Sequence, residues 1–343
     1  MGTVTITDVA RAADVSAATV SRVLNNPDGV SPELRQRVIE AIDALGYRPN
    51  SSARSLRTRA TRVLGVIVSD VTNPFFTSMV RGVEDVAQKS GYSVMLANTD
   101  EDLAKEQRYL EVFAAEQIAG VVLSPASATD TRIDVLSRRG IPAVTFDRRL
   151  RTAEVDRVTI NNRRAAEQAT EHLIEQGCRR IAFISGPPGI STSSERLAGY
   201  HAGLRRAGLP IEPGLVSDGG FRVVGGHEAA LRLLAQDPRP DGMLVANNLM
   251  TVGAVNALDD LALRVPTDLA LVGFDDLSWA LNARSRITTV DQPTYEIGRR
   301  AAELLLGRVQ GERSPARRIT LPATLTVRDS SRRLPVSDGQ PVR

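Results

Sequence analysis

The chain has 343 residues, of which 42% are apolar, and it carries a formal net charge of +3. This length exceeds one ordinary domain and favours two to three domains with a sizeable core. No run approaches the roughly 18 to 20 apolar residues of a bilayer span, which excludes an integral membrane protein. The N-terminus lacks the pattern of a secretory signal, and a single cysteine, Cys178, excludes an internal disulfide. We therefore expect a cytoplasmic protein.

The positive charge is concentrated near the N-terminus. Residues 1–62 contain nine arginines and six acidic residues, whereas the basic and acidic residues of the remainder cancel. From Ala44 to Ser69 there are five arginines and no acidic residue. Such a strip is either a solvated basic linker or a surface that neutralises DNA phosphates, and the charge alone does not decide between them.

Three short helices are predicted in the first 46 residues. The first begins after Thr5, because Thr5 and Asp8 have the spacing of a capping box. Ser16 is expected to cap the second helix after a tight turn, and the third runs from Pro32 to Gly46. The residues expected to form the shared core are Ile6, Val9, Ala10, Ala13, Val20, Val23, Leu24, Val38, Ile42 and Leu45. This pattern is typical of a helix-turn-helix module.

The second predicted helix is suited to DNA. A short helix that presents small side chains and one arginine fits a major groove about 12 Å wide, where arginine reads guanine. Its outward residues are Ala17, Ala18, Ser21, Arg22 and Asn25.

Residues 5–26 (TITDVARAADVSAATVSRVLNN) and 30–58 (VSPELRQRVIEAIDALGYRPNSSARSLRT) closely resemble the DNA-binding headpiece of the LacI/GalR family. The resemblance implies that residues 16–25 form the recognition helix and that residues 50–57 form a hinge helix. It also implies that Leu56 is an apolar wedge inserted in the minor groove, the alternative being an ordinary leucine on a helix face. The implied DNA-binding residues are Thr5, Ser16, Ala17, Ala18, Thr19, Ser21, Arg22, Asn25, Asn50, Ala53, Arg54 and Leu56.

From Val63 onward, short apolar runs alternate with amphipathic stretches, as in buried parallel strands separated by helices. The alternation predicts two doubly wound lobes. Expected strands are 63–68, 92–97, 120–124, 142–146, 158–160, 180–186, 242–247 and 270–276. Expected helices are 76–90, 103–117, 130–139, 162–176, 194–207, 225–235 and 249–262.

This second part also resembles the periplasmic-binding-protein fold of LacI/GalR regulators. Its landmarks are SDVTNPFF (69–76), FDR (146–148), ERLAGY (195–200), LVANN (244–248), GFDD (273–276) and TTVDQP (288–293). The predicted fold class is therefore an all-α three-helix helix-turn-helix headpiece plus an α/β two-lobed sensor domain with parallel doubly wound sheets. The expected boundaries are a headpiece at 1–47, a hinge at 48–61, a sensor domain at 62–330 and a disordered tail at 331–343. Within the sensor domain we expect an N-lobe at 62–161 and 291–320 and a C-lobe at 162–290 and 321–330.

The landmark residues follow the carboxyl ends of predicted strands, where α/β sheets bind ligands. A polyol needs oxygen acceptors, an arginine and a flat ring against its apolar face. By resemblance, hydrogen bonding is assigned to Asp147, Arg196, Asn247 and Asp275, and stacking to Phe76, Phe221 and either Phe75 or Trp279. The alternatives are that the two aspartates cap loops and that Phe221 belongs to the core. Asn248 stands where sugar-binding relatives usually have aspartate, so the effector class stays open, with a neutral or acidic sugar preferred.

Other classes of protein fit the sequence less well. The GPPG at 186–189 lacks the lysine and hydroxyl of a nucleotide-binding loop, and there is no nucleophile elbow or metal-spaced histidine cluster. His172, His201 and His227 are expected on polar helix surfaces or at helix starts. We therefore predict no catalytic residue, metal or cofactor. A transport binding protein is excluded by the headpiece.

The predicted function is that of an effector-controlled transcriptional repressor. The expected partners are a pseudopalindromic double-stranded DNA operator, a small-molecule effector of carbohydrate type, and a second copy of the chain. Dimerisation follows because one headpiece covers only a half-site. The tail lacks the heptads of a coiled coil, so a dimer rather than a tetramer is expected.

Overall fold

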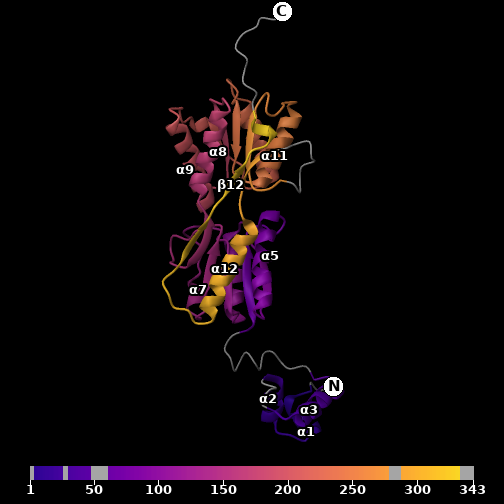
Figure 1. Cartoon of the computed structure of the whole chain (residues 1–343). Helices are drawn as coiled ribbons and strands as arrows, with labels where there is room; N and C mark the ends of the chain where they lie inside the picture. Colours follow the sequence, from indigo (N-terminus) through magenta and orange to yellow (C-terminus); the bar gives the residue numbers. More distant parts are fainter. Residues whose placement is uncertain (1–3, 26–29, 48–60, 278–286, 333–343) are drawn as a thin grey trace, which may run out of the picture. The chain divides into compact units, whose positions relative to one another are not determined.

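A computed structural model describes residues 4–25, 30–47, 61–277 and 287–332. The chain divides into two compact units, residues 1–61 and 62–343, which we call the headpiece and the sensor domain (Figure 1). No helix of the described residues is long and apolar enough to span a bilayer.

The headpiece contains the three predicted helices, α1 (Ile6–Ala12), α2 (Ala17–Asn25) and α3 (Pro32–Leu45). The capping box at α1 is formed, since the Thr5 amide donates to Asp8 Oδ2 over 2.9 Å and the Asp8 amide donates to Thr5 Oγ1. Ser16 caps α2 by accepting from the Thr19 amide at 3.1 Å. Gly46 ends α3 with a φ of +60°, a left-handed conformation that glycine adopts without strain.

The fully buried side chains of the headpiece are all small. Leu45 was predicted to belong to it and does not, because the last turn of α3 lies at the rim of the core and leaves Leu45 37% exposed. Ala41 is buried in its place, and its small side chain permits close packing of α3. The buried residues are Val9, Ala10, Ala13, Val20, Val23, Val38 and Ala41.

The first lobe of the sensor domain, the N-lobe, is a sheet of parallel strands in the order β11-β5-β4-β3-β1-β2. Successive residues of β1 face opposite sides, so Val66 packs in the cluster that holds Val83 of α5, and Ile67 packs with Leu110 of α6. The strands are β1 (Val63–Val68), β2 (Ser93–Asn98), β3 (Gly120–Leu123), β4 (Ala143–Phe146), β5 (Asp156–Ile160) and β11 (Arg318–Leu321). The helices are α5 (Pro74–Lys89), α6 (Leu103–Ala115), α7 (Asp134–Ser137) and α12 (Thr294–Val309).

The second lobe, the C-lobe, has the strand order β12-β10-β9-β8-β6-β7, in which only β12 is antiparallel to its neighbour. The edge strand β7 was not predicted, because it is only three residues long and none of them is fully buried. The strands are β6 (Ile181–Ser185), β7 (Val216–Asp218), β8 (Gly242–Val245), β9 (Ala270–Phe274), β10 (Thr288–Asp291) and β12 (Thr324–Thr326). The helices are α8 (Asn162–Glu175), α9 (Ser191–Arg206), α10 (Val223–Leu234) and α11 (Asn248–Asp260).

The chain passes between the lobes three times: from β5 to α8, from β10 to α12, and from β11 to β12. In Figure 1 the third passage is drawn in yellow, and it runs from the lower lobe to β12 in the upper lobe. Three connections hold the lobes together while allowing their separation to change by bending.

Two expectations about polar residues are wrong. His172 was predicted on a polar surface, but it is buried, and its Nε2 is 2.8 Å from Ser331 Oγ. Ser331 was predicted to begin a disordered tail, yet it is fully buried and its Oγ lies 2.6 Å from Thr288 Oγ1. The reason is the same for both, since a buried polar side chain needs a partner and these three residues satisfy one another.

Candidate functional site

A cavity lies at the carboxyl ends of strands from both lobes. All seven residues predicted to bind an effector line it. It also involves residues that were not predicted. The lining residues are Asp70, Asn73, Phe75, Phe76, Glu101, Asp147, Arg148, Thr192, Arg196, Phe221, Arg222, Asn247 and Asp275.

The backbone around this cavity is strained. Eight non-glycine residues of the described chain have a positive φ, and four of them line the cavity: Glu101, Asp147, Phe221 and Asp275, with φ between +57° and +69°. Such a conformation costs about 1–3 kcal/mol per residue and clusters at sites of binding or catalysis. The gathering of four such residues around one cavity makes it the candidate functional site.

Asp147 follows β4 of the N-lobe and Asp275 follows β9 of the C-lobe, and both side chains are buried. Burial raises the pKa of Asp275 to about 7, opposed by the charge of Arg196, and burial also raises the pKa of Asp147. Asp275 Oδ1 accepts from Gln292 Nε2 at 2.6 Å, whereas Asp147 Oδ1 has no hydrogen-bond partner within the described chain. Within the described residues no backbone amide donates to either carboxylate, which disfavours a role in capping loops.

Arg196 supplies a buried positive charge to this site. Its Nε donates to Asn162 Oδ1 at 2.8 Å, and its Nη1 donates to the Ala246 carbonyl. The guanidinium carbon lies 4.3 Å from the centre of the Phe274 ring, a cation–π contact. These contacts hold the arginine in one position, from which its charge acts on Asp147 and Asp275.

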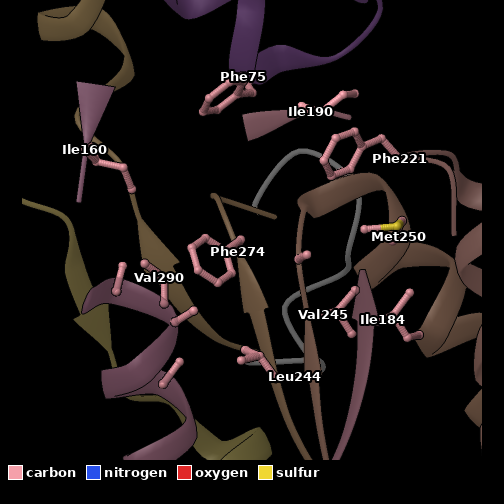
Figure 2. Close-up of a cluster of buried hydrophobic side chains, with 14 of the residues drawn as sticks. Phe75, Ile160, Ile184, Ile190, Phe221, Leu244, Val245, Met250, Phe274 and Val290 are labelled. Atoms are coloured by element: carbon pink, nitrogen blue, oxygen red, sulfur yellow. The ribbon is translucent and has the colours of Figure 1, made fainter. Parts of the chain in front are cut away.

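Aromatic rings form the apolar part of the cavity wall. Phe75 and Phe76 pack edge to face, with ring centres 5.1 Å apart. Phe221 lies against Gly186, where a Cβ atom would come within 2.1 Å of the ring, so a side chain at that position would displace Phe221. Figure 2 shows Phe75 and Phe221 at one end of the C-lobe strands and Phe274 on β9. Phe221 is thus both a buried residue and a wall of the cavity.

The two lobes are joined across the cavity by polar contacts. Asn248 forms a reciprocal amide pair with Asn73 of the N-lobe, at 2.8 and 3.1 Å. An aspartate at position 248 could accept a hydrogen bond from the Asn73 amide, but it could not donate one to the Asn73 oxygen as Asn248 does. Asn247 accepts from the Met250 amide at 2.9 Å and so begins α11 while lining the cavity.

Sequence reasoning missed several charged residues of the wall. Arg222 of the C-lobe pairs with Asp70 of the N-lobe at 3.1 Å, and Arg148 forms a two-bond pair with Glu101, each bond 2.6 Å. Asp70 lies within the recognised landmark at 69–76 and could have been found there. Arg148 likewise lies within the landmark at 146–148, whereas Glu101 and Arg222 stand in loops with no local signal.

The predicted DNA-binding residues fall into two groups. In the headpiece, Ala17, Ala18 and Arg22 are exposed on α2, while Thr5 and Ser16 also cap helices. Thr19 Oγ1 lies 2.9 Å from Ser16 Oγ, and Ser21 is half-buried. Asn25 ends α2. The hinge residues Asn50, Ala53, Arg54 and Leu56, and likewise Trp279, lie outside the described residues.

A helix-turn-helix headpiece followed by a two-lobed sensor domain defines the class of DNA-binding regulators that respond to a ligand. The family model described as "Bacterial regulatory proteins, lacI family" matches residues 5–50. A "Periplasmic binding protein-like domain" matches residues 170–331. The chain belongs to the lacI family of bacterial transcriptional regulators.

Relatives of known role support this assignment over nearly the whole chain. Catabolite control protein A of Priestia megaterium is 34% identical over 96% of this chain and 99% of its own length. The ribose operon repressor of Escherichia coli K12 is 35% identical over 95% of this chain and 99% of its own. These relatives are regulators and not enzymes, as expected.

Solved structures agree with the fold. The lac repressor dimer bound to operator and the anti-inducer ONPF has a TM-score of 0.84 at 27% identity, covering 96% of this chain and 99% of that one. The transcriptional regulator CelR in complex with cellobiose has a TM-score of 0.73 at 36% identity, covering 95% and 99%.

Proposed function

We propose that this chain is a dimeric repressor whose affinity for a pseudopalindromic operator is controlled by a sugar or sugar derivative held in the cavity between the lobes. The observation that carries the proposal is the pair of buried carboxylates, Asp147 from one lobe and Asp275 from the other, with the buried Arg196 beside them. A ligand that contacts both lobes has a higher affinity for the closed arrangement and so shifts the conformational equilibrium.

The chemistry of the cavity favours a molecule rich in hydroxyl groups. Carboxylate oxygens accept from sugar hydroxyls, a guanidinium donates to neighbouring oxygens, and aromatic rings cover the apolar face of a sugar ring. The unpartnered Asp147 Oδ1 is an acceptor that such a hydroxyl would satisfy. The names of the relatives point the same way, since they include a ribose operon repressor and a family member from Enterococcus faecium with bound ribose.

The DNA side of the proposal rests on α2 and on the strip of arginines at 44–69. Arg22 is exposed on α2 and is assigned to base reading, whereas Arg57 is assigned to phosphates. Replacing Arg22 with alanine is expected to cost about 1–3 kcal/mol of DNA-binding free energy and to relax base preference. Arg57→Ala should weaken binding to all DNA sequences alike. Operator affinity should fall steeply with salt through counterion release.

The effector is sought by a thermal-shift screen of sugars, sugar acids and nucleosides, followed by calorimetry with the best compound. Asp275→Asn keeps the shape of the side chain and removes its charge, so it should weaken effector binding by at least about tenfold. Asp259→Asn makes the same change at an exposed position of α11 and should bind normally. Equal affinity in both variants would show that the cavity is not the effector site.

A further inference from the structure

A second hollow lies outside the effector cavity and spans both lobes. Its N-lobe wall contains Arg149, Arg151 and Arg157, and its C-lobe wall contains Arg163 with Ser191 and Ser194. A smaller hollow shares Arg151 and Arg157 with it and adds Arg318. We call the two together the arginine hollow. Five arginines therefore face one continuous depression.

The acidic residues of this region do not balance the arginines. Arg149 pairs with Glu195, and Arg318 pairs with Glu154 at 3.0 Å, where Glu154 is 81% exposed and the pair correspondingly weak. For the side chains of Arg151, Arg157 and Arg163, the described part of the chain shows no ion pair and no hydrogen-bond acceptor. The arginine hollow thus keeps an excess of three positive charges.

Strand register brings two of these charges together. Arg157 on β5 and Arg318 on β11 are direct partners in the parallel ladder, so their side chains stand on the same face. Like charges at such positions destabilise a sheet unless a counter-ion intervenes. Arg157 is half-buried, and burial together with the charges of Arg318 and Arg149 lowers its pKa. The fold therefore tolerates repulsion between Arg157 and Arg318, and a bound anion would reduce that repulsion.

Two helices of the C-lobe add to the attraction for an anion. Helix α8 (Asn162–Glu175) and helix α9 (Ser191–Arg206), which pack side by side in Figure 1, both begin at the arginine hollow. Neither has an acidic residue in its first turn, and Glu195, which follows the first turn of α9, is paired with Arg149. Arginines from one lobe thus face two positive helix ends from the other.

We propose that the arginine hollow binds a small anion carrying two or more phosphoryl groups, which bridges the N-lobe and the C-lobe. Guanidinium groups match phosphate oxygens in pairs, and an excess of three charges suits a polyanion better than a single carboxylate.

The arginine hollow shares its wall with the effector cavity. Arg149 and Ser191 face the hollow, and their chain neighbours Arg148 and Thr192 line the cavity. The Arg149 amide donates to Ser191 Oγ at 2.9 Å and so already joins the lobes there. An anion that holds the lobes together at this point should raise effector affinity, and by linkage the effector should raise anion affinity. This coupling rests on the proposed effector site, whereas anion binding itself does not.

The test is calorimetric titration of the full-length chain with inorganic pyrophosphate at low ionic strength, in a buffer without phosphate or sulfate. One saturable site per chain is expected. Arg157→Gln and Arg151→Gln should each weaken binding about tenfold, since each removes charge-assisted hydrogen bonds. Arg139→Gln is the matched control, since Arg139 is exposed and lies outside the hollow, and it should bind as wild type does. Arg151 is itself exposed, so its variant keeps the test valid even if Arg157→Gln unfolds.

Several outcomes would overturn the proposal. Absence of saturable binding would do so, and so would equal affinity in Arg151→Gln and Arg139→Gln. Loss of binding in Arg54→Gln with retention in Arg151→Gln would place the anion on the basic strip of residues 44–69. Orthophosphate that binds as tightly as pyrophosphate would contradict a ligand that bridges two lobes. Since pyrophosphate titration needs no effector, its failure leaves the proposed function untouched, and failure of Asp275→Asn to lose the effector leaves the arginine hollow untouched.

Discussion

The headpiece and the effector cavity carry function in opposite ways. On α2 the residues assigned to DNA reading lie within ten consecutive positions, and Ala17, Ala18 and Arg22 are exposed. Around the cavity the residues come from positions 70 to 275, and Asp147, Arg196 and Asp275 among them are buried. One helix and its cap therefore bring the DNA-reading residues together, whereas the topology of two sheets brings the residues of the effector site together.

The two regions also differ in what stabilises them. The buried residues of the headpiece core are valines and alanines, with larger side chains such as Leu24 and Ile42 only partly buried against them, so its stability depends on tight packing of a small apolar volume. The cavity buries an arginine among carboxylates and strained backbone, and its stability depends on charges that compensate one another. Changes of different kinds should therefore damage the two regions separately.

The largest effect is expected for a charge placed in the headpiece core. Val38→Asp buries an unpaired carboxylate at a site with no exposure and should cost more than about 4 kcal/mol, enough to unfold the headpiece. Ile39→Asp is the matched control, because Ile39 is the next residue on α3 and is 37% exposed. Calorimetry and limited proteolysis should show the headpiece lost in Val38→Asp alone and the unfolding transition of the sensor domain retained. A sensor domain that unfolds with it would show that the two regions are not separable.

A somewhat smaller loss is expected in the sensor domain when its buried cation is removed. Arg196→Met leaves Asp275 without its positive neighbour, whereas Asp147 keeps Arg148 at 3.6 Å, and should cost about 3–5 kcal/mol. Arg139→Met, at an exposed position, should change little. Denaturant unfolding at neutral pH measures both. A variant Arg196→Met as stable as wild type would mean that Asp275 carries no charge in the folded protein.

The pH dependence of stability tests the buried carboxyl directly. Because the pKa of Asp275 is raised to about 7 in the folded state, the native protein holds this proton more tightly than the unfolded chain. Its contribution to stability should therefore fall as pH rises from about 4 to about 7. Asp275→Asn removes this loss and should be more stable than wild type at pH 8, on the order of a few kcal/mol, with no gain near pH 4. A gain that is independent of pH would contradict the assignment.

The smallest effect concerns the helix caps of the headpiece. Thr5→Ala removes the capping box of α1 and should cost about 1 kcal/mol. Ser31 stands at the corresponding position of α3 but makes no side-chain hydrogen bond there, so Ser31→Ala should cost little. Thermal unfolding of the two variants distinguishes them, and equal losses would mean that the Thr5 cap does not stabilise α1.

The comparison also shows what sequence could predict. Helix caps such as Thr5 and Ser16 were found because a cap and its partner lie within three residues. The strand-end aspartates were found because buried strands end where apolar runs end. The pairing of Asn248 with Asn73 and of Arg222 with Asp70 was missed, since each joins residues more than 150 positions apart.

Burial of polar residues was the other source of error. His172 looks like a polar helix residue, and Ser331 looks like the beginning of a polar tail. Their hydrogen bond, which joins α8 to Ser331, makes both compatible with the interior. Leu45 is the opposite case, an apolar residue that was predicted to be buried and is exposed. The apolar stripe of α3 continues to its last turn, and the sequence does not show whether another element covers that turn.

The central claim is that the cavity between the lobes controls DNA binding by the headpiece. The most direct measurement is fluorescence anisotropy of a DNA site selected with the full-length protein, titrated with the effector found by screening. Wild type should change its DNA affinity about 5- to 150-fold on effector binding. Asp275→Asn should bind the same DNA with unchanged affinity and show no response at the same effector concentration. A response in Asp275→Asn equal to that of wild type would contradict the account.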